Sequence, residues 1–310
     1  HALVRDAAYA AIPRALRAEK HLRVAGWIES LGRPDDYAEL LAHHYLAALD
    51  LASAAGVEVT ELSDRALAAL RRAGDRALAL HAYAAAAHFH RRALDLTADD
   101  DPARGRTLLE LGLSLFLSEA GGEDELLAAR DALRGAEDRE QAAETEMLLA
   151  ERYRGVGRPE LYEKHLAAAG ELARGLGPSE VKARVLLSIA GAFLRTGEHE
   201  QALDAGREAL ALVEDVGLDE LRARALSQIG TARLQMDDEA WFADLEQSLE
   251  LASSLGSPEA IRAHSTLAHQ LRHRGDFRRG LEYLKEAIRI ADRFGDVPFL
   301  FRLLAMVYAH

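Results

Sequence analysis

The chain of 310 residues carries a formal net charge of −13, which argues against a general nucleic-acid-binding protein because such proteins hold phosphates with lysine and arginine. Cysteine is absent, so disulfides and thiolate metal sites are excluded. No apolar run approaches the roughly 20 residues of a membrane-spanning helix, and the composition favours helix over sheet, so we expect an all-α cytoplasmic protein without membrane contact.

The first part of the chain, residues 1–58, is predicted to form a short helical adaptor. Pro13 suits the first turn of a helix, where its missing amide needs no partner, and Gly56 suits a helix end. The expected helices span residues 2–12, 13–31 and 37–54.

From residue 59 to residue 310, small residues recur about every 38 residues, and most of them follow a large apolar residue. A period of this length is typical of stacked helical hairpins, because a lone hairpin cannot bury both of its faces. The sequence therefore predicts about six and a half hairpins, whose first helices pack closely at the small residues. These are Gly74, Gly112, Ala150, Ala190, Gly230, Ala268 and Ala305.

Glycines punctuate the same repeat at two further places. Glycine adopts left-handed backbone at no steric cost, so it is favoured in tight turns and just after helix ends. The expected turns within hairpins lie at Gly157, Gly197 and Gly275, with Asp237 in place of glycine. The expected ends of second helices lie at Gly177, Gly217, Gly256 and Gly295.

The hairpin at 186–217 is the best-preserved copy, and it resembles the tetratricopeptide repeat (TPR). Ala190, Phe193, Ala202 and Ala209 match that family's small and aromatic positions. The resemblance implies an all-α solenoid with a right-handed superhelix. It also implies that the first helices line a concave groove that binds a protein or peptide.

A second resemblance covers residues 1 to about 97. Three stretches resemble the segment that follows the ATPase core in STAND-type signalling ATPases: HALVRDAAYAAIPRALRAEKHLRVAGWIE, AELLAHHY and RRAGDRALALHAYAAAAHFHRRALDL. Such ATPases include LuxR-type and adenylate-cyclase-fused bacterial regulators. The resemblance implies a fragment that serves as a non-catalytic sensor or scaffold arm, with the ATPase domain of the same polypeptide as a partner.

No P-loop accompanies this resemblance, because the chain's lysines lack the glycines of that motif. The nucleotide site of the parent protein would then lie outside the chain, and no cofactor is expected. The alternative is a stand-alone TPR receptor or scaffold that binds peptides. An all-helical enzyme is disfavoured, because no paired acids or nucleophile and base can be found.

The candidate ligand groove is polar and partly cationic. Arginine recurs six residues before the small residue of several first helices, and guanidinium groups suit an acidic peptide or a carboxylate. The alternative is that these arginines only form ion pairs within their own helices, as with Glu259 and Arg262. The candidates are Arg106, Arg184, Ser188, Arg224, Gln228, Thr231, Arg262, Thr266, His269 and His273.

The spacing of the histidines in the sequence does not predict a metal site. His269 and His273 share a helix face, but two ligands do not make a site, and His264 lies on another face. His43 and His44 are expected to diverge, because neighbouring side chains on a helix point about 100° apart.

Two apolar features are left. Trp241 and Phe242 stand where a small residue is usual, so they are interpreted as core, with a partner anchor as the alternative. Residues 298–310 form an apolar first helix without its second helix, which predicts either a chain cut within a repeat or self-association through this helix.

Overall fold

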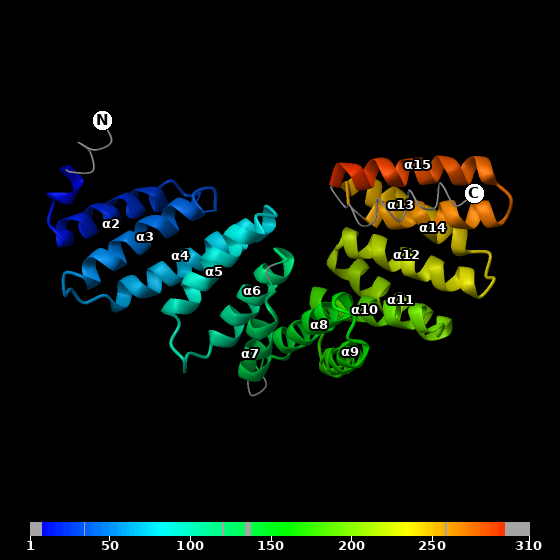
Figure 1. Cartoon of the computed structure of the whole chain (residues 1–310), viewed down its shortest axis with the longest axis horizontal. Coiled ribbons are helices and arrows are strands. Elements are labelled where there is room, and N and C mark those ends of the chain that lie inside the picture. Colours follow the sequence, from blue (N-terminus) through cyan, green and yellow to red (C-terminus); the bar gives the residue numbers. More distant parts are fainter. Residues whose placement is uncertain (1–7, 34, 120, 134–137, 258, 295–310) are drawn as a thin grey trace. The chain divides into compact units, whose positions relative to one another are not determined.

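The computed structural model describes residues 8–33, 35–119, 121–133, 138–257 and 259–294. Over these ranges the regular elements are all α-helices, joined by short turns (Figure 1). The all-α prediction is therefore confirmed. No helix in the described ranges is long and apolar enough to cross a membrane.

The chain divides into two compact units, His1–Gly157 and Arg158–His310. In the first unit, each described helix packs against the next one along the chain. Its helices are α2 (Arg14–Ser30), α3 (Ala38–Ser53), α4 (Thr60–Ala79), α5 (Tyr83–Leu96), α6 (Arg104–Leu117), α7 (Glu123–Leu133) and α8 (Arg139–Gly155). Of the expected helix at 2–12, residues 8–10 are helical, and residues 1–7 lie outside the described ranges. The predicted division at residue 58 into adaptor and array stays a prediction.

The second unit repeats this arrangement. Its helices are α9 (Pro159–Ala173), α10 (Glu180–Thr196), α11 (His199–Val216), α12 (Asp219–Gln235), α13 (Trp241–Leu255), α14 (Glu259–His273) and α15 (Phe277–Phe294). Besides the contacts between successive helices, the first helices of neighbouring hairpins also touch, α10 with α12 and α12 with α14. Three first helices therefore lie side by side.

The small residues mark the close helix contacts, as predicted. A Cβ on Gly112 would lie 2.8 Å from Leu126 of α7, and one on Gly230 would lie 2.9 Å from Leu245 of α13. The alanines at the same repeat position are almost fully buried. These are Ala150, Ala190 and Ala268, while Ala305 lies outside the described residues.

Left-handed backbone occurs at each predicted turn, at Gly157, Gly197, Asp237 and Gly275. It also occurs at His81 and Glu119, which the search for glycine missed. All six residues follow the small residue of their helix by seven positions, so the turn geometry is part of the repeat even where the side chain disfavours it.

The predicted helix ends need one correction. Gly217 and Gly256 have positive φ, as expected, but Gly177 does not, because α9 ends four residues earlier on a right-handed cap at Arg174. Gly295 lies outside the described residues. The connector after α9 therefore reaches the next helix without a glycine cap, and Ser179 caps that helix by accepting a hydrogen bond from the amide of Lys182.

Candidate functional site

The candidate groove residues of the second unit lie on one face of three neighbouring first helices. Each helix contributes four positions spaced i, i+4, i+7 and i+11, which fall within about 60° of its circumference. We call this surface the groove face. It comprises Arg184, Ser188, Gly191 and Arg195 of α10, Arg224, Gln228, Thr231 and Gln235 of α12, and Arg262, Thr266, His269 and His273 of α14.

Three of these residues, Gly191, Arg195 and Gln235, are not among the residues predicted from the sequence. Gly191 leaves room beside Gln228, whose Nε2 would lie 3.4 Å from a Cβ placed on the glycine. Arg195 is exposed, and its guanidinium lies over the ring of Tyr162, to whose hydroxyl it also donates a hydrogen bond. The repeat register was the signal that could have found them, because they continue the spacing of the predicted positions.

The groove face contains four arginines and two histidines but no acidic residue. The corresponding positions of the first unit differ. Arg106 on α6 is followed by Glu110 and two leucines, and α8 has Glu144 and Glu151 at equivalent places. At these positions arginine is therefore more frequent on α10, α12 and α14 of the second unit than on α6 and α8 of the first unit, to which Arg106 belongs.

Ion pairs account for two of the predicted arginines. Arg106 Nε lies 2.7 Å from Glu110 Oε1, and this hydrogen bond raises the pKa of Arg106. Arg262 Nε lies 3.1 Å from Glu259 Oε2, although the Arg262 side chain stays 61% exposed. Arg184 and Arg224 are half-buried on α10 and α12. The intrahelical alternative is thus realised for Arg106 and Arg262, and the side chain of Arg262 stays exposed to solvent.

The shorter polar residues of the groove face lie deeper. Gln228 is 7% exposed, and its Nε2 donates to the Leu187 carbonyl at 3.0 Å, which ties α12 to α10. Thr231 donates to the Ser227 carbonyl of its own helix, and Ser188 is buried. These side chains form the more buried part of the groove face, and the arginines and histidines form its more exposed part.

His269 and His273 lie in edge-to-face contact, with ring centroids 4.3 Å apart. Partial burial, with His273 and Arg272 nearby, lowers the pKa of His269. His264 is buried elsewhere, against Tyr283 of α15. Among the described residues, no group of three or more histidines and carboxylates is placed to hold a metal ion.

The prediction that His43 and His44 diverge is wrong. Their rings lie 5.3 Å apart, because both turn toward His21 on α2. His21 Nδ1 is 2.9 Å from His44 Nδ1, and the hydroxyl of Tyr9 is 2.7 Å from His21 Nε2. We call His21, His43 and His44 the histidine cluster. Adjacent side chains of one helix can therefore lie close together when both contact a third side chain from another helix.

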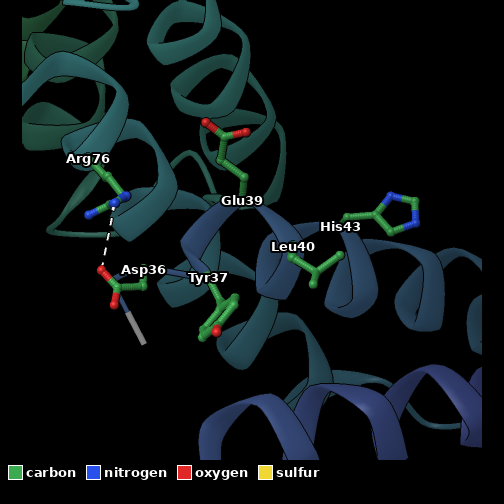
Figure 2. Close-up of a pocket in the computed structure, with 6 residues that line it drawn as sticks. All are labelled: Asp36, Tyr37, Glu39, Leu40, His43 and Arg76. Atoms are coloured by element: carbon green, nitrogen blue, oxygen red, sulfur yellow. Dashed lines mark ion pairs between the residues drawn. The ribbon is translucent and has the colours of Figure 1, made fainter. Parts of the chain in front are cut away.

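A surface depression of about 470 Å³ adjoins this cluster in the first unit (Figure 2). Its side chains spread over the start of α3, with Arg76 facing Asp36 from α4 at 3.8 Å. Acidic, basic and apolar groups are mixed here, unlike the single sign of charge on the groove face. The lining residues are Asp36, Tyr37, Glu39, Leu40, His43 and Arg76.

Trp241 lies in the core, as interpreted from the sequence. It is 3% exposed and packs with Leu234, Leu245 and Leu267. The apolar segment 298–310, predicted to self-associate or to mark a cut repeat, lies outside the described residues.

No protein-family model matches the chain, and neither does any curated protein. Solved structures match its fold. The apo form of RapI aligns with 90% of this chain and 99% of its own, at 12% identity and a TM-score of 0.64. A Rap protein complexed with Competence and Sporulation Factor aligns with 94% of this chain and 82% of its own, at 15% identity and a TM-score of 0.63.

A STAND protein with a tetratricopeptide repeat sensor, from Pyrococcus horikoshii, is also similar. It covers 93% of this chain, and the match takes in 42% of that protein, at 14% identity and a TM-score of 0.54. The chain has a TPR-like fold of helical hairpins. At such low identity these structures establish the fold alone.

Proposed function

We propose that the chain is a non-catalytic protein-binding scaffold whose second unit holds an acidic peptide segment on the groove face. The observation that carries this proposal is the distribution of charge. Twelve positions on α10, α12 and α14 include four arginines and no acid, in a chain whose net charge is −13. A cationic surface kept free of acids in an acidic protein suits carboxylate ligands.

The size of the groove face favours a peptide over a small molecule. Helices that pack in this way lie about 9 Å apart, so three of them span roughly 20 Å. An extended peptide advances about 3.4 Å per residue, so five or six residues would cross all three helices. Arg184, Arg224 and Arg262 would then each contact a different acidic side chain along the peptide.

The fold of a Rap protein solved with Competence and Sporulation Factor supports ligand binding by an array of this kind. We further propose that the chain is the sensor arm of a STAND-type ATPase. The resemblance of residues 1 to about 97 and the likeness to the Pyrococcus horikoshii protein support this role. The stand-alone receptor remains the second candidate, and a P-loop encoded upstream in the same gene would distinguish the two.

The groove is tested by neutralising its arginines. Arg184→Gln, Arg224→Gln and Arg262→Gln are combined, and binding to a library of glutamate-rich hexapeptides is measured by fluorescence anisotropy. We expect the triple variant to bind the selected peptides at least about tenfold more weakly, a loss of ~1.4 kcal/mol. Arg106→Gln is a control outside the groove face, because it removes an arginine of the other unit and should leave the affinity unchanged. Unchanged affinity of the triple variant would refute the groove proposal.

A further inference from the structure

The outward face of α2 is apolar and cationic. On a helix of 3.6 residues per turn, six exposed residues of α2 and its cap fall within about 100° of the circumference, opposite the buried Ala18, Ala25 and Ile28. We call this surface the outer α2 face. It comprises Leu16, Lys20, Arg23, Val24, Trp27 and Leu31.

This face lacks acidic residues, although the chain as a whole is acidic. The two glutamates of α2, Glu19 and Glu29, project outside the arc on the same helical count. Glu29 instead accepts hydrogen bonds from Tyr45 and Arg65. The face therefore carries two positive charges among four large apolar side chains.

The apolar side chains of this face are unusually accessible. Trp27 is 61% exposed, and Leu16, Val24 and Leu31 are also exposed. Among the described helices, α2 packs extensively against α3, which covers its opposite side (Figure 1). Contiguous exposed apolar side chains bordered by charged residues mark interaction surfaces in folded proteins, so this face indicates one.

The face also has a shape suited to another helix. Leu16, Lys20 and Val24 form one row at i, i+4 spacing, and Arg23, Trp27 and Leu31 form a second row. Such rows are the ridges between which side chains of a second helix pack. A depression of about 350 Å³ lies among Lys20, Arg23, Val24 and Trp27, where an apolar side chain flanked by carboxylates would fit.

We propose that the outer α2 face docks an acidic amphipathic helix of a protein partner. The apolar stripe of that helix would cover Trp27 and its neighbours, and its carboxylates would pair with Lys20 and Arg23. The face runs for about 22 Å from Leu16 to Leu31, which corresponds to four turns of the partner helix. This surface is separate from the groove face and does not depend on the function proposed for it.

Charge argues against two other occupants of this face, a second copy of the chain and an anionic membrane. A symmetric second copy would place Lys20 and Arg23 against the same cations, because a two-fold interface joins identical patches. An anionic membrane would attract only two cations of this face while facing a chain of net charge −13. An acidic partner helix satisfies both the charge and the apolar area.

The test uses Trp27 as its own reporter. The chain has two tryptophans, and Trp241 is buried, so a change in emission on binding at this face comes from Trp27. The probe is a designed, tryptophan-free helical peptide with leucines on one face and glutamates beside them. We expect a saturable blue shift, absent in Trp27→Phe, and at least about tenfold weaker binding by Lys20→Glu/Arg23→Glu.

Matched controls separate specific docking from general attraction. Lys164→Glu/Arg278→Glu makes the same change of net charge at exposed sites of the second unit and should bind the peptide like the parent chain. A peptide with lysines in place of the glutamates should give no shift. The proposal is overturned if the acidic peptide gives no shift. It is also overturned if only vesicles containing phosphatidylserine shift the emission, or if the emission shifts with protein concentration alone.

Discussion

His90 occupies the space that a side chain on Gly74 would need. Its Nε2 atom lies 2.1 Å from the position of a Cβ on Gly74, and the His90 side chain is fully buried between α4 and its neighbours. His90 Nδ1 lies 2.8 Å from Ser114 Oγ, whose hydroxyl donates to the Glu110 carbonyl. His90 Nδ1–H is therefore the donor to Ser114, and α4, α5 and α6 are held around one imidazole.

This contact predicts that Gly74→Ala destabilises the protein by about 1–3 kcal/mol, because the added methyl group displaces the His90 ring. Urea denaturation measures the loss. A double-mutant cycle with His90→Ala should show strong coupling, since the methyl group meets no ring in that background. Gly26→Ala is the control. It lies in helix α2 with nothing within 4 Å of its Cβ position, and it should stabilise slightly. Equal effects of Gly74→Ala and Gly26→Ala would contradict the packing described.

The turns at Glu119 and Asp237 hold non-glycine residues in left-handed backbone, with φ of 59° and 56°. Glycine adopts this conformation without steric cost, so Glu119→Gly or Asp237→Gly should each raise stability by roughly 1 kcal/mol. Gly197→Ala, at the equivalent turn, should lower stability by a similar amount. Thermal melts of the three variants test this, and a loss of stability in both glycine variants would show that their side chains stabilise the turns.

Ala190 is fully buried where α10 meets its neighbours. Ala190→Leu should force the helices apart and cost about 1–3 kcal/mol. Ala167→Leu is the matched control, because Ala167 is exposed on α9 and its enlargement meets solvent. Chemical denaturation of both variants would reveal the difference. A neutral Ala190→Leu would argue against the repeat register.

The histidine cluster predicts a loss of stability in mild acid. Burial, followed by the neighbouring charges of His43 and Arg17, lowers the pKa of His21, and burial followed by His21 and His43 lowers that of His44. Since these folded-state pKa values lie below the unfolded value of about 6.5, the unfolded chain binds more protons in acid. The contribution of the neutral His21 and His44 to stability is therefore present above about pH 6.5 and is lost as the pH falls below that value.

The hydrogen bonds of the histidine cluster predict the same direction of pH dependence. A neutral His21 can accept from Tyr9 at Nε2 while donating to His44 from Nδ1, and protonation removes one of these bonds. Urea midpoints at pH 7.5 and 5.5 should differ less in His21→Gln/His44→Gln than in the parent chain. His88→Gln, at an exposed site on α5, should leave the pH dependence unchanged. An unaltered difference in the double variant would rule out the cluster as its source.

The helical repeat and its register could be predicted from the residues alone. Helix periodicity is a local property, so small residues at fixed spacing, such as Ala190 and Gly230, marked the close contacts correctly. Glycine signalled the turns at Gly157 and Gly197, because left-handed backbone has a residue preference.

Which distant side chains meet depends on how the helices pack, and the residue pattern does not predict it. His21 draws His43 and His44 together from another helix, and no spacing along α3 foretells that. Glu119 adopts left-handed backbone because the helices on both sides of the turn are packed, which outweighs its own preference. The members of the groove face and the exposure of Trp27 likewise depend on how helices stack, since stacking selects which side of each helix is covered.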